Sequence, residues 1–367
     1  MEKTYDVIVI GGGVIGSIIA WRLGQAGADV LLLEKGALGE HGASGAAAGM
    51  LGAQFEMEEP GPAYDAAIKS RGLYPALADE LLDETGISIQ LSQAGTLRLA
   101  HSENEVALLK KRAAWQVALG ARAEWLSSDA VSRREPLLAN VHGALDLPDD
   151  RNVAAPLVHQ ALAAAARKRT EVREGTAVYR CEVVDQAVTV TTSAGRFHAK
   201  RIVLASGAWT GQIAGLPRVK NEIAPVKGQI FALRPRSAHR LTHTVFASTV
   251  YLVPKQDGRI VVGASEEHGA GFNQDVTPEA LASLFGALKA VAPDLTTASF
   301  ESAWVGFRPG TADAKPQLGP HPETDRVIYA TGHFRNGILL APITGRWISE
   351  YLLGRTDVAA FAPFLPR

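Results

Sequence analysis

Three glycines near the start of the chain have the spacing of a dinucleotide-binding turn. They are Gly11, Gly13 and Gly16, in the pattern G-x-G-x-x-G. In such a turn the first glycine permits a tight bend, the second lets a pyrophosphate approach the backbone, and the third lets a helix pack closely on a strand. The free N–H groups at the start of the helix would then face the phosphates. The glycines therefore predict a pyrophosphate site.

A carboxylate follows at the distance that a ribose contact needs. Glu34 lies roughly 20 residues after the glycines, where it can accept hydrogen bonds from a ribose diol. It would also repel a 2′-phosphate, which argues against NADP. This unit by itself leaves FAD and NAD as alternatives.

The glycines lie in a predicted βαβ unit. Residues 7–10 and 30–33 are continuous apolar runs, which are typical of strands buried on both faces of a parallel sheet. In the middle of the chain the pattern becomes antiparallel, most clearly in a hairpin of residues 251–253 and 260–262. Helices are predicted over residues 152–167 and from residue 336 onward.

These elements together predict an α/β fold. A Rossmann-like nucleotide domain, discontinuous in sequence, would carry an inserted α+β domain built on an antiparallel sheet. We assign residues 1–86, 145–216 and 302–367 to the nucleotide-binding domain. Residues 87–144 and 217–301 are assigned to the substrate-binding domain.

Charge and composition exclude several classes of partner. Lys plus Arg total 37 against 38 for Asp plus Glu, so no net field favours nucleic acid or an anionic membrane. No apolar run approaches the ~20 residues that span a bilayer, and no signal peptide is expected ahead of the first strand. The single cysteine, Cys181, fits a reducing compartment. We expect a soluble, cytoplasmic protein with no membrane and no nucleic-acid partner.

Metal binding is not expected. His239 and His243 have the i, i+4 spacing of zinc ligands on a possible helix. The zinc-protease pattern also needs a glutamate directly after the first histidine, and Arg240 occupies that position.

Further segments resemble the D-amino-acid oxidase superfamily of FAD-dependent amine oxidases. Together with the N-terminal glycines, they follow one another in the order found in that superfamily, from residue 7 to about residue 353. Within this superfamily, the segments resemble more closely the glycine oxidases of thiamine biosynthesis. The segments are residues 43–53, 202–209, 225–229, 306–311 and 332–342.

The resemblance implies that the dinucleotide is FAD. Small residues at 46–49 would let the backbone contact a flat ligand, and Gly337 would open a helix whose N–H groups face the reduced flavin. Cys181 lies outside the C-terminal region where sarcosine oxidases carry a flavin-linking cysteine, so FAD should be noncovalent. The residues expected to contact FAD are Gly11, Gly13, Val14, Ile15, Gly16, Glu34, Lys35, Ser44, Ala47, Ala48, Gly49, Met50, Val178, Ser206, Gly207, Trp209, His333, Arg335, Asn336, Gly337, Ile338 and Leu339.

The resemblance also implies a catalytic set for a carboxylate substrate. Arg308, Arg335 and Tyr251 match the two arginines and the tyrosine that hold the substrate in glycine oxidases. A planar guanidinium can bind a carboxylate through two hydrogen bonds, and a phenol adds one directional donor. Met50 and Glu266 complete the expected substrate-binding residues.

Two positions depart from one branch of the family. That branch has a histidine where this chain has Thr249 and a methionine where it has Glu266. A glutamate near the pocket could change the preferred amine, so glycine, sarcosine, small D-amino acids and larger N-substituted glycines all stay open.

The implied reaction needs no catalytic base. If the amine binds in its neutral form, hydride can leave Cα directly for flavin N5. The imine then hydrolyses to glyoxylate and ammonia or an amine, and O₂ is reduced to hydrogen peroxide. A D-amino-acid oxidase, a quinone-linked dehydrogenase and a non-catalytic flavin-binding redox sensor remain alternatives. The family tends to homotetramers, so a homo-oligomer is expected.

Overall fold

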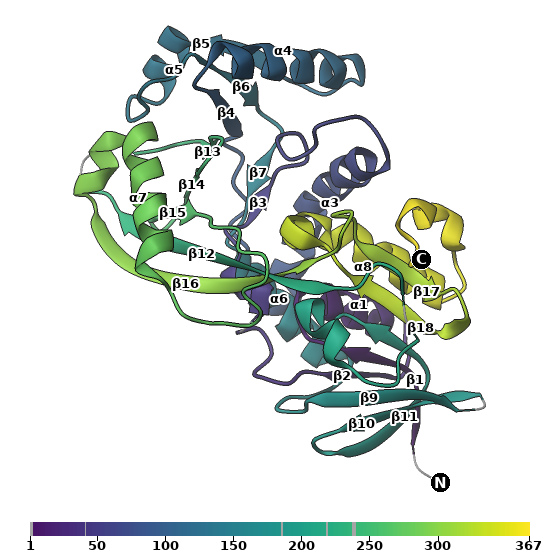
Figure 1. Ribbon diagram of the computed structural model, residues 1–367. Coiled ribbons are helices and arrows are strands. Elements are labelled where there is room, and N and C mark those ends of the chain that lie inside the picture. Colours follow the sequence, from purple (N-terminus) through teal and green to yellow (C-terminus); the bar gives the residue numbers. More distant parts are fainter. Residues whose placement is uncertain (1–2, 41, 185, 218, 237–239) are drawn as a thin grey trace.

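The computed structural model describes residues 3–40, 42–184, 186–217, 219–236 and 240–367. Within these residues the strands form two sheets of eight strands each and one two-stranded pair. Figure 1 shows the two large sheets side by side, with helices packed on each of them. The predicted α/β class is confirmed.

The first sheet contains the predicted βαβ unit. Its strand order is β17-β18-β11-β1-β2-β8, and the hairpin of β9 and β10 continues from β11. The pairs β11–β1, β1–β2, β2–β8 and β11–β18 are parallel. The bounds are β1 Thr4–Ile10, β2 Val30–Leu33, β8 Glu171–Arg173, β9 Val178–Val184, β10 Ala187–Thr192, β11 Gly195–Leu204, β17 Gln317–His321 and β18 Thr324–Thr331.

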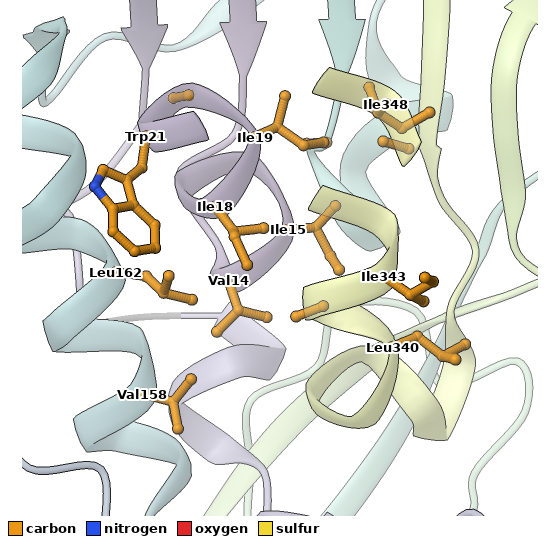
Figure 2. Close-up of a cluster of buried hydrophobic side chains, with 14 of the residues drawn as sticks. Val14, Ile15, Ile18, Ile19, Trp21, Val158, Leu162, Leu340, Ile343 and Ile348 are labelled. Atoms are coloured by element: carbon orange, nitrogen blue, oxygen red, sulfur yellow. The ribbon is translucent and has the colours of Figure 1, made fainter. Parts of the chain in front are cut away.

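Helices cover one face of this sheet, and the apolar side chains between helices and sheet form a continuous core. Figure 2 shows Ile15 and Ile18 of α1 directed toward α8, and Trp21 lying beside Leu162 of α6. Helix α3 packs against both α6 and α8. On the other face, the β9–β10 hairpin covers a separate cluster around Ile8. The helix bounds are α1 Val14–Gln25, α3 Pro62–Thr85, α6 Ala155–Arg169 and α8 Gly337–Leu352.

The second sheet is almost wholly antiparallel. Its order is β16-β12-β15-β14-β13-β4-β6-β5, and only β13 and β4 pair in parallel. Helix α7 covers one face, where Leu284 and Leu288 pack into a buried cluster with Phe231. The bounds are β4 Thr96–Ala100, β5 Glu124–Ser127, β6 Gly143–Leu147, β12 Ala224–Arg234, β13 Thr244–Phe246, β14 Tyr251–Pro254, β15 Ile260–Gly263, β16 Ser299–Gly310, α4 Glu103–Ala118, α5 Ser128–Arg134 and α7 Pro278–Val291.

Long strands and one short pair connect the two sheets. Strands β12 and β16 pair along their whole lengths and extend toward the first sheet (Figure 1). Strand β3 (Met50–Leu51) pairs with β7 (Arg151–Asn152), and α2 (Gly42–Ala46) packs on β16. The indole N–H of Trp304 donates to the Ala46 carbonyl at 3.0 Å. The small-residue segment is thus held between the sheets.

Several elements differ from their predicted bounds. The helix predicted from residue 152 begins at Ala155, because Arg151 and Asn152 pair with β3 as strand β7. Two of the expected domain boundaries, at residues 145 and 302, fall inside β6 and β16, which pair in the second sheet along their full lengths. We therefore propose that the domains divide at the ends of these strands.

The described residues do not form the helix predicted around His239 and His243. Residues 240–243 are not helical, and His239 lies outside the described residues. The ring of His243 is hydrogen-bonded to Glu135 at 2.6 Å. No helix in the described part of the chain is long and apolar enough to cross a membrane.

Candidate active site

A large cavity is lined by residues from both sheets. Its volume is about 1040 Å³. The nucleotide turn contributes Gly11 and Gly13, and the second sheet contributes Tyr251 and Arg308. Most of the predicted cofactor residues and all of the predicted substrate residues therefore border one continuous space.

The glycine turn leaves no room for side chains. Gly11 has φ +99°, and a Cβ there would lie 2.6 Å from the Ala205 carbonyl oxygen. A Cβ on Gly16 would lie 1.8 Å from the Gly11 carbonyl oxygen. Since real Cβ atoms do not approach so closely, these positions admit only glycine without a backbone shift. The start of α1 is capped by Ser44, whose Oγ accepts from the Val14 N–H at 3.0 Å.

Glu34 lies at the end of β2 with its carboxylate at the cavity wall. One oxygen accepts from the Gly12 N–H at 2.7 Å, and the other accepts from the Gly36 N–H at 2.9 Å. Each carboxylate oxygen has more than one lone pair, so both retain capacity for a ribose hydroxyl. The open glycine cradle and this carboxylate fit an adenine dinucleotide.

The C-terminal segment forms another wall of the cavity. Its residues Asn336, Gly337 and Ile338 mark the start of α8 and line the cavity. His333 is buried behind them, and its Nε2 contacts the Thr344 hydroxyl at 3.0 Å. Burial lowers the pKa of His333 to about 3, so the ring is neutral and contributes no charge.

Lys35 and Trp209 meet at the same edge of the cavity. The Lys35 ammonium lies 3.6 Å from the centroid of the Trp209 ring, which is within the range of a cation–π contact. The indole also stacks on Phe272 at 4.9 Å. Burial lowers the pKa of Lys35.

The structure places most of the predicted cofactor residues at the cavity and two of them elsewhere. Gly16 packs against Gly11 behind the turn, in the close-packing position that the pattern predicts for a third glycine. The Leu339 side chain does not line the cavity, because it is buried in the helical core, where the Leu339 carbonyl accepts from Ser70 Oγ at 2.6 Å. One step along a helix turns a side chain by about 100°, so Ile338 faces the cavity and Leu339 faces away.

Arg308 is held by backbone groups of the second sheet. Its Nη1 donates to the Ser265 carbonyl at 3.0 Å and lies 3.5 Å from the Lys227 carbonyl. The guanidinium occupies the space above Gly228, where a Cβ would be 2.6 Å from Nη1. Among the described residues Arg308 forms no ion pair with a carboxylate. Its charge is therefore available to a ligand.

Tyr251 begins β14, and its hydroxyl lies over Gly263, where a Cβ would be 2.6 Å from it. Desolvation raises the pKa of Tyr251 to about 12, although Arg308 acts in the opposite direction. The phenol is therefore protonated at neutral pH and can donate a hydrogen bond into the cavity.

Arg335 has carboxylate partners, unlike Arg308. Its Nη2 lies 3.1 Å from Glu56 Oε2, and its Nη1 lies 3.8 Å from Glu266 Oε2. The other Glu266 oxygen contacts His268 Nε2 at 3.0 Å. Arg335, Glu56 and Glu266 all line the cavity, as does Met50.

Sequence reasoning missed several residues that shape the site. Glu56 is the first charged residue after the small-residue segment, and this position was the one signal that could have identified it. Trp304 carries no such signal, because its role depends on the distant Ala46 carbonyl. Lys255 is half-buried, and its Nζ donates to the Ala48 and Val153 carbonyls at 2.5 and 2.9 Å. Burial lowers the pKa of Lys255 to about 7.

Comparison with known proteins gives the family. The model of the FAD dependent oxidoreductase family matches residues 6–351. The chain belongs to this family. Its cofactor is therefore FAD, and the nucleotide turn with Glu34 is the part of the cavity that fits it.

Two relatives cover almost the whole chain. A glycine oxidase from Bacillus licheniformis is 38% identical over 356 residues, which span 96% of this chain and 94% of that protein. The crystal structure of glycine oxidase from Geobacillus kaustophilus superposes with a TM-score of 0.94 at 36% identity, covering 99% of this chain and 98% of that one. The resemblance to glycine oxidases is confirmed.

A third relative bears on the resemblance to the glycine oxidases of thiamine biosynthesis. The bifunctional protein ThiO/ThiG from Synechocystis is 35% identical, and the match covers 99% of this chain but 54% of that protein. The chain thus corresponds to about half of that larger protein.

Proposed function

We propose that this FAD-dependent oxidoreductase oxidises glycine or a small N-substituted glycine. The observation that carries the proposal is the state of Arg308, which lies in the cavity over Gly228 and forms no ion pair among the described residues. A guanidinium in this state is suited to a carboxylate, which it can bind through two parallel hydrogen bonds. The high identity to glycine oxidases supports glycine as the parent substrate.

The residues of the second sheet would orient the substrate. Arg308 binds the carboxylate, and the protonated Tyr251 hydroxyl donates a further hydrogen bond to it. Fixing the carboxylate at these two points sets the direction of the Cα–H bond relative to the nucleotide half of the cavity. Arg335 lies further toward Glu56 and Glu266, and these two carboxylates compensate its charge.

The nucleotide half would hold the cofactor. Gly13 and Ile15 line the cavity at the glycine turn and the start of α1, where their N–H groups would face the pyrophosphate, and Glu34 would accept hydrogen bonds from the ribose. When bound, FAD would supply the acceptor for the hydride, and O₂ would take up the two electrons with two protons and leave as hydrogen peroxide. The substrate nitrogen lone pair forms the C=N bond as the hydride leaves Cα, and water converts the imine to glyoxylate and ammonia or an amine.

Anaerobic flavin reduction tests the substrate proposal. Glycine or sarcosine should bleach the flavin absorption without any pyridine nucleotide, and in air each should give equal amounts of glyoxylate and peroxide. Small D-amino acids and N-ethylglycine belong in the same series. The proposal is wrong if none of these compounds reduces the flavin, or if reduction occurs and only a quinone reoxidises it.

We also propose that FAD is held without a covalent bond. Cys181, the single thiol of the chain, is buried in β9 away from the cavity, and burial raises the pKa of Cys181 to about 12. Acid precipitation should therefore release all of the flavin into the supernatant. Flavin that stays with the precipitated polypeptide would contradict this proposal.

The same family resemblance suggests the compartment and the oligomeric state of the enzyme. We propose a cytoplasmic homotetramer with no membrane or nucleic-acid partner, which agrees with the near-zero net charge and the single buried cysteine. Sedimentation equilibrium of the FAD-loaded protein measures the assembly. A monomer at micromolar concentration would contradict the tetramer.

A further inference from the structure

The two arginines at the substrate end of the cavity have opposite surroundings. Arg308 contacts backbone carbonyls, which compensate little of its charge, and it has no carboxylate partner among the described residues. Arg335 lies between two carboxylates, with Glu56 at 3.1 Å and Glu266 at 3.8 Å. Only one of the two positive charges is therefore free to attract an anion.

The carboxylates beside Arg335 differ in how firmly they are held. The Glu56 side chain is 9% exposed and forms the closer contact with the guanidinium. The Glu266 side chain is 39% exposed, and it also contacts His268, which is itself largely exposed. Of the two carboxylates, Glu266 is therefore the one that a substrate in the cavity can approach with little protein in between.

The charges in this part of the cavity cancel. Arg308 and Arg335 contribute two positive charges, and Glu56 and Glu266 contribute two negative ones. A substrate with one carboxylate can pair with Arg308 and leave the group around Arg335 intact. A second carboxylate, carried on the amine substituent, would meet Arg335, which is already paired. It would also meet the negative charges of Glu56 and Glu266. Like-charge contacts of this kind are a common means of rejecting the wrong ligand.

We propose that Glu266, acting with Glu56 on Arg335, makes the enzyme select amino acids with a single carboxylate and reject those whose N-substituent carries a second one. This inference rests on the proposed function and specifies its substrate class. It identifies Glu266 as a specificity-determining residue, at a position where another branch of the family has an uncharged methionine.

Ligand binding tests this selection without any turnover. Methoxyacetate and oxydiacetate are ether analogues of N-methylglycine and N-carboxymethylglycine, and neither has an amine to oxidise. Each is titrated into the FAD-loaded protein, and the flavin difference spectrum gives its Kd. We expect wild type to bind methoxyacetate more tightly than oxydiacetate.

A charge series at one position then separates charge from shape. In Glu266→Gln the ratio of the two Kd values should shift at least about tenfold toward oxydiacetate, and Glu266→Lys should shift it further in the same direction. Glu103→Gln is the matched control, because that carboxylate is 86% exposed on α4 and does not line the cavity. The proposal would be overturned if the ratio of the two Kd values is the same in wild type and in all three variants. That outcome includes the case in which a variant shifts both Kd values by the same factor.

Turnover extends the test to substrates and keeps the two proposals distinguishable. N-(carbamoylmethyl)glycine has the shape of N-carboxymethylglycine without its second charge. Glu266→Gln should raise kcat/KM for the dicarboxylate relative to this amide by at least about tenfold. If wild type oxidises neither compound nor glycine, the proposed function fails while the binding ratios still decide the role of Glu266. If it oxidises glycine and the relative kcat/KM is unchanged in the variant, only the inference about Glu266 fails.

Discussion

The nucleotide half and the substrate half of the cavity are built on different principles. In the nucleotide half the backbone makes the site, and glycines at Gly11 and Gly16 are required because a Cβ at either position would overlap a backbone carbonyl. In the substrate half charged and aromatic side chains make the site, and they come from segments far apart in the chain. Tyr251 stands on β14, Arg308 on β16, and Arg335 just before α8.

This difference predicts different consequences of mutation. A change in the nucleotide turn should affect FAD content and stability, because it moves backbone. A change in the substrate half should affect turnover while FAD stays bound, because it removes a side chain that the cofactor does not need. The experiments below test this separation, in order of decreasing effect.

The largest effect is expected for Arg308→Ala. Leaving a substrate carboxylate without its desolvated partner typically costs about 2–5 kcal/mol, so kcat/KM for glycine should fall by roughly 30- to several-thousand-fold. Arg308→Lys should recover part of the loss, because an ammonium cannot make the two-pronged contact. Anaerobic stopped-flow reduction measures both.

The matched control for Arg308 is Arg346→Ala, which removes an exposed arginine on α8 that pairs with Glu350. FAD content should be the same in all three variants. Wild-type affinity and reduction rate in Arg308→Ala would show that another residue anchors the substrate. Loss of FAD from that variant would break the separation between the two halves.

Tyr251→Phe should give a smaller loss of the same kind. One hydrogen bond to a charged group is worth about 1.5–3 kcal/mol, which corresponds to a decrease of roughly 10- to 100-fold in kcat/KM. Because burial holds the pKa of Tyr251 at about 12, wild-type activity should show no contribution from its ionisation below about pH 10. Profiles of kcat/KM against pH for both proteins check this, and a wild-type value in the variant would exclude Tyr251 from substrate binding.

Gly16→Ala should act on the other half. The added Cβ would lie 1.8 Å from the Gly11 carbonyl, and relief of such overpacking typically costs about 1–3 kcal/mol. We expect weaker FAD binding and a lower Tm, with Kd measured by flavin fluorescence. In Gly72→Ala, a change inside α3 where a Cβ would meet no atom within 4 Å, FAD affinity should stay close to wild type and Tm should not fall, because alanine favours a helix over glycine by about 1 kcal/mol. Normal FAD affinity combined with a large KM increase in Gly16→Ala would contradict the division of roles.

The effect that is smallest per step of the measurement, here one pH unit, concerns Lys255, which links the two halves. Its pKa is lowered by burial to about 7, so between about pH 7 and pH 10 the unfolded chain holds a proton that the folded chain has released. Stability of the wild type should therefore rise with pH in this window relative to Lys255→Met, by at most about 1.4 kcal/mol per pH unit. Urea unfolding at several pH values measures the difference. Parallel stability profiles for the two proteins would show that Lys255 stays protonated when folded.

Local patterns in the sequence were enough to predict the nucleotide half. Gly11, Gly13 and Gly16 must be close in sequence because one turn contains them, and the adjacent apolar runs identify the strands that the turn joins. The same holds for the hairpin of β14 and β15, whose pairing depends on a short loop. Such features are encoded by neighbouring residues, so a pattern of spacing and apolarity reveals them.

The substrate half could be predicted only through the family resemblance. Nothing near Arg308 in the sequence shows that its guanidinium lies over Gly228, since that contact depends on the pairing of β12 with β16. The partners of Arg335 come from positions 56 and 266, and no local rule relates three residues so far apart. Leu339 packs into the core while Ile338 lines the cavity, because one step along a helix decides which way a side chain faces.

The sequence by itself thus determined the α/β class and the glycine turn with Glu34 after it, which we propose hold the pyrophosphate and the ribose. Only the tertiary structure decided that Arg308 is free of carboxylates while Arg335 lies between Glu56 and Glu266. The physical reason is that a nucleotide turn is made of backbone groups in one short segment. The charge balance of a cavity, in contrast, is a sum over side chains that meet only after both sheets have formed.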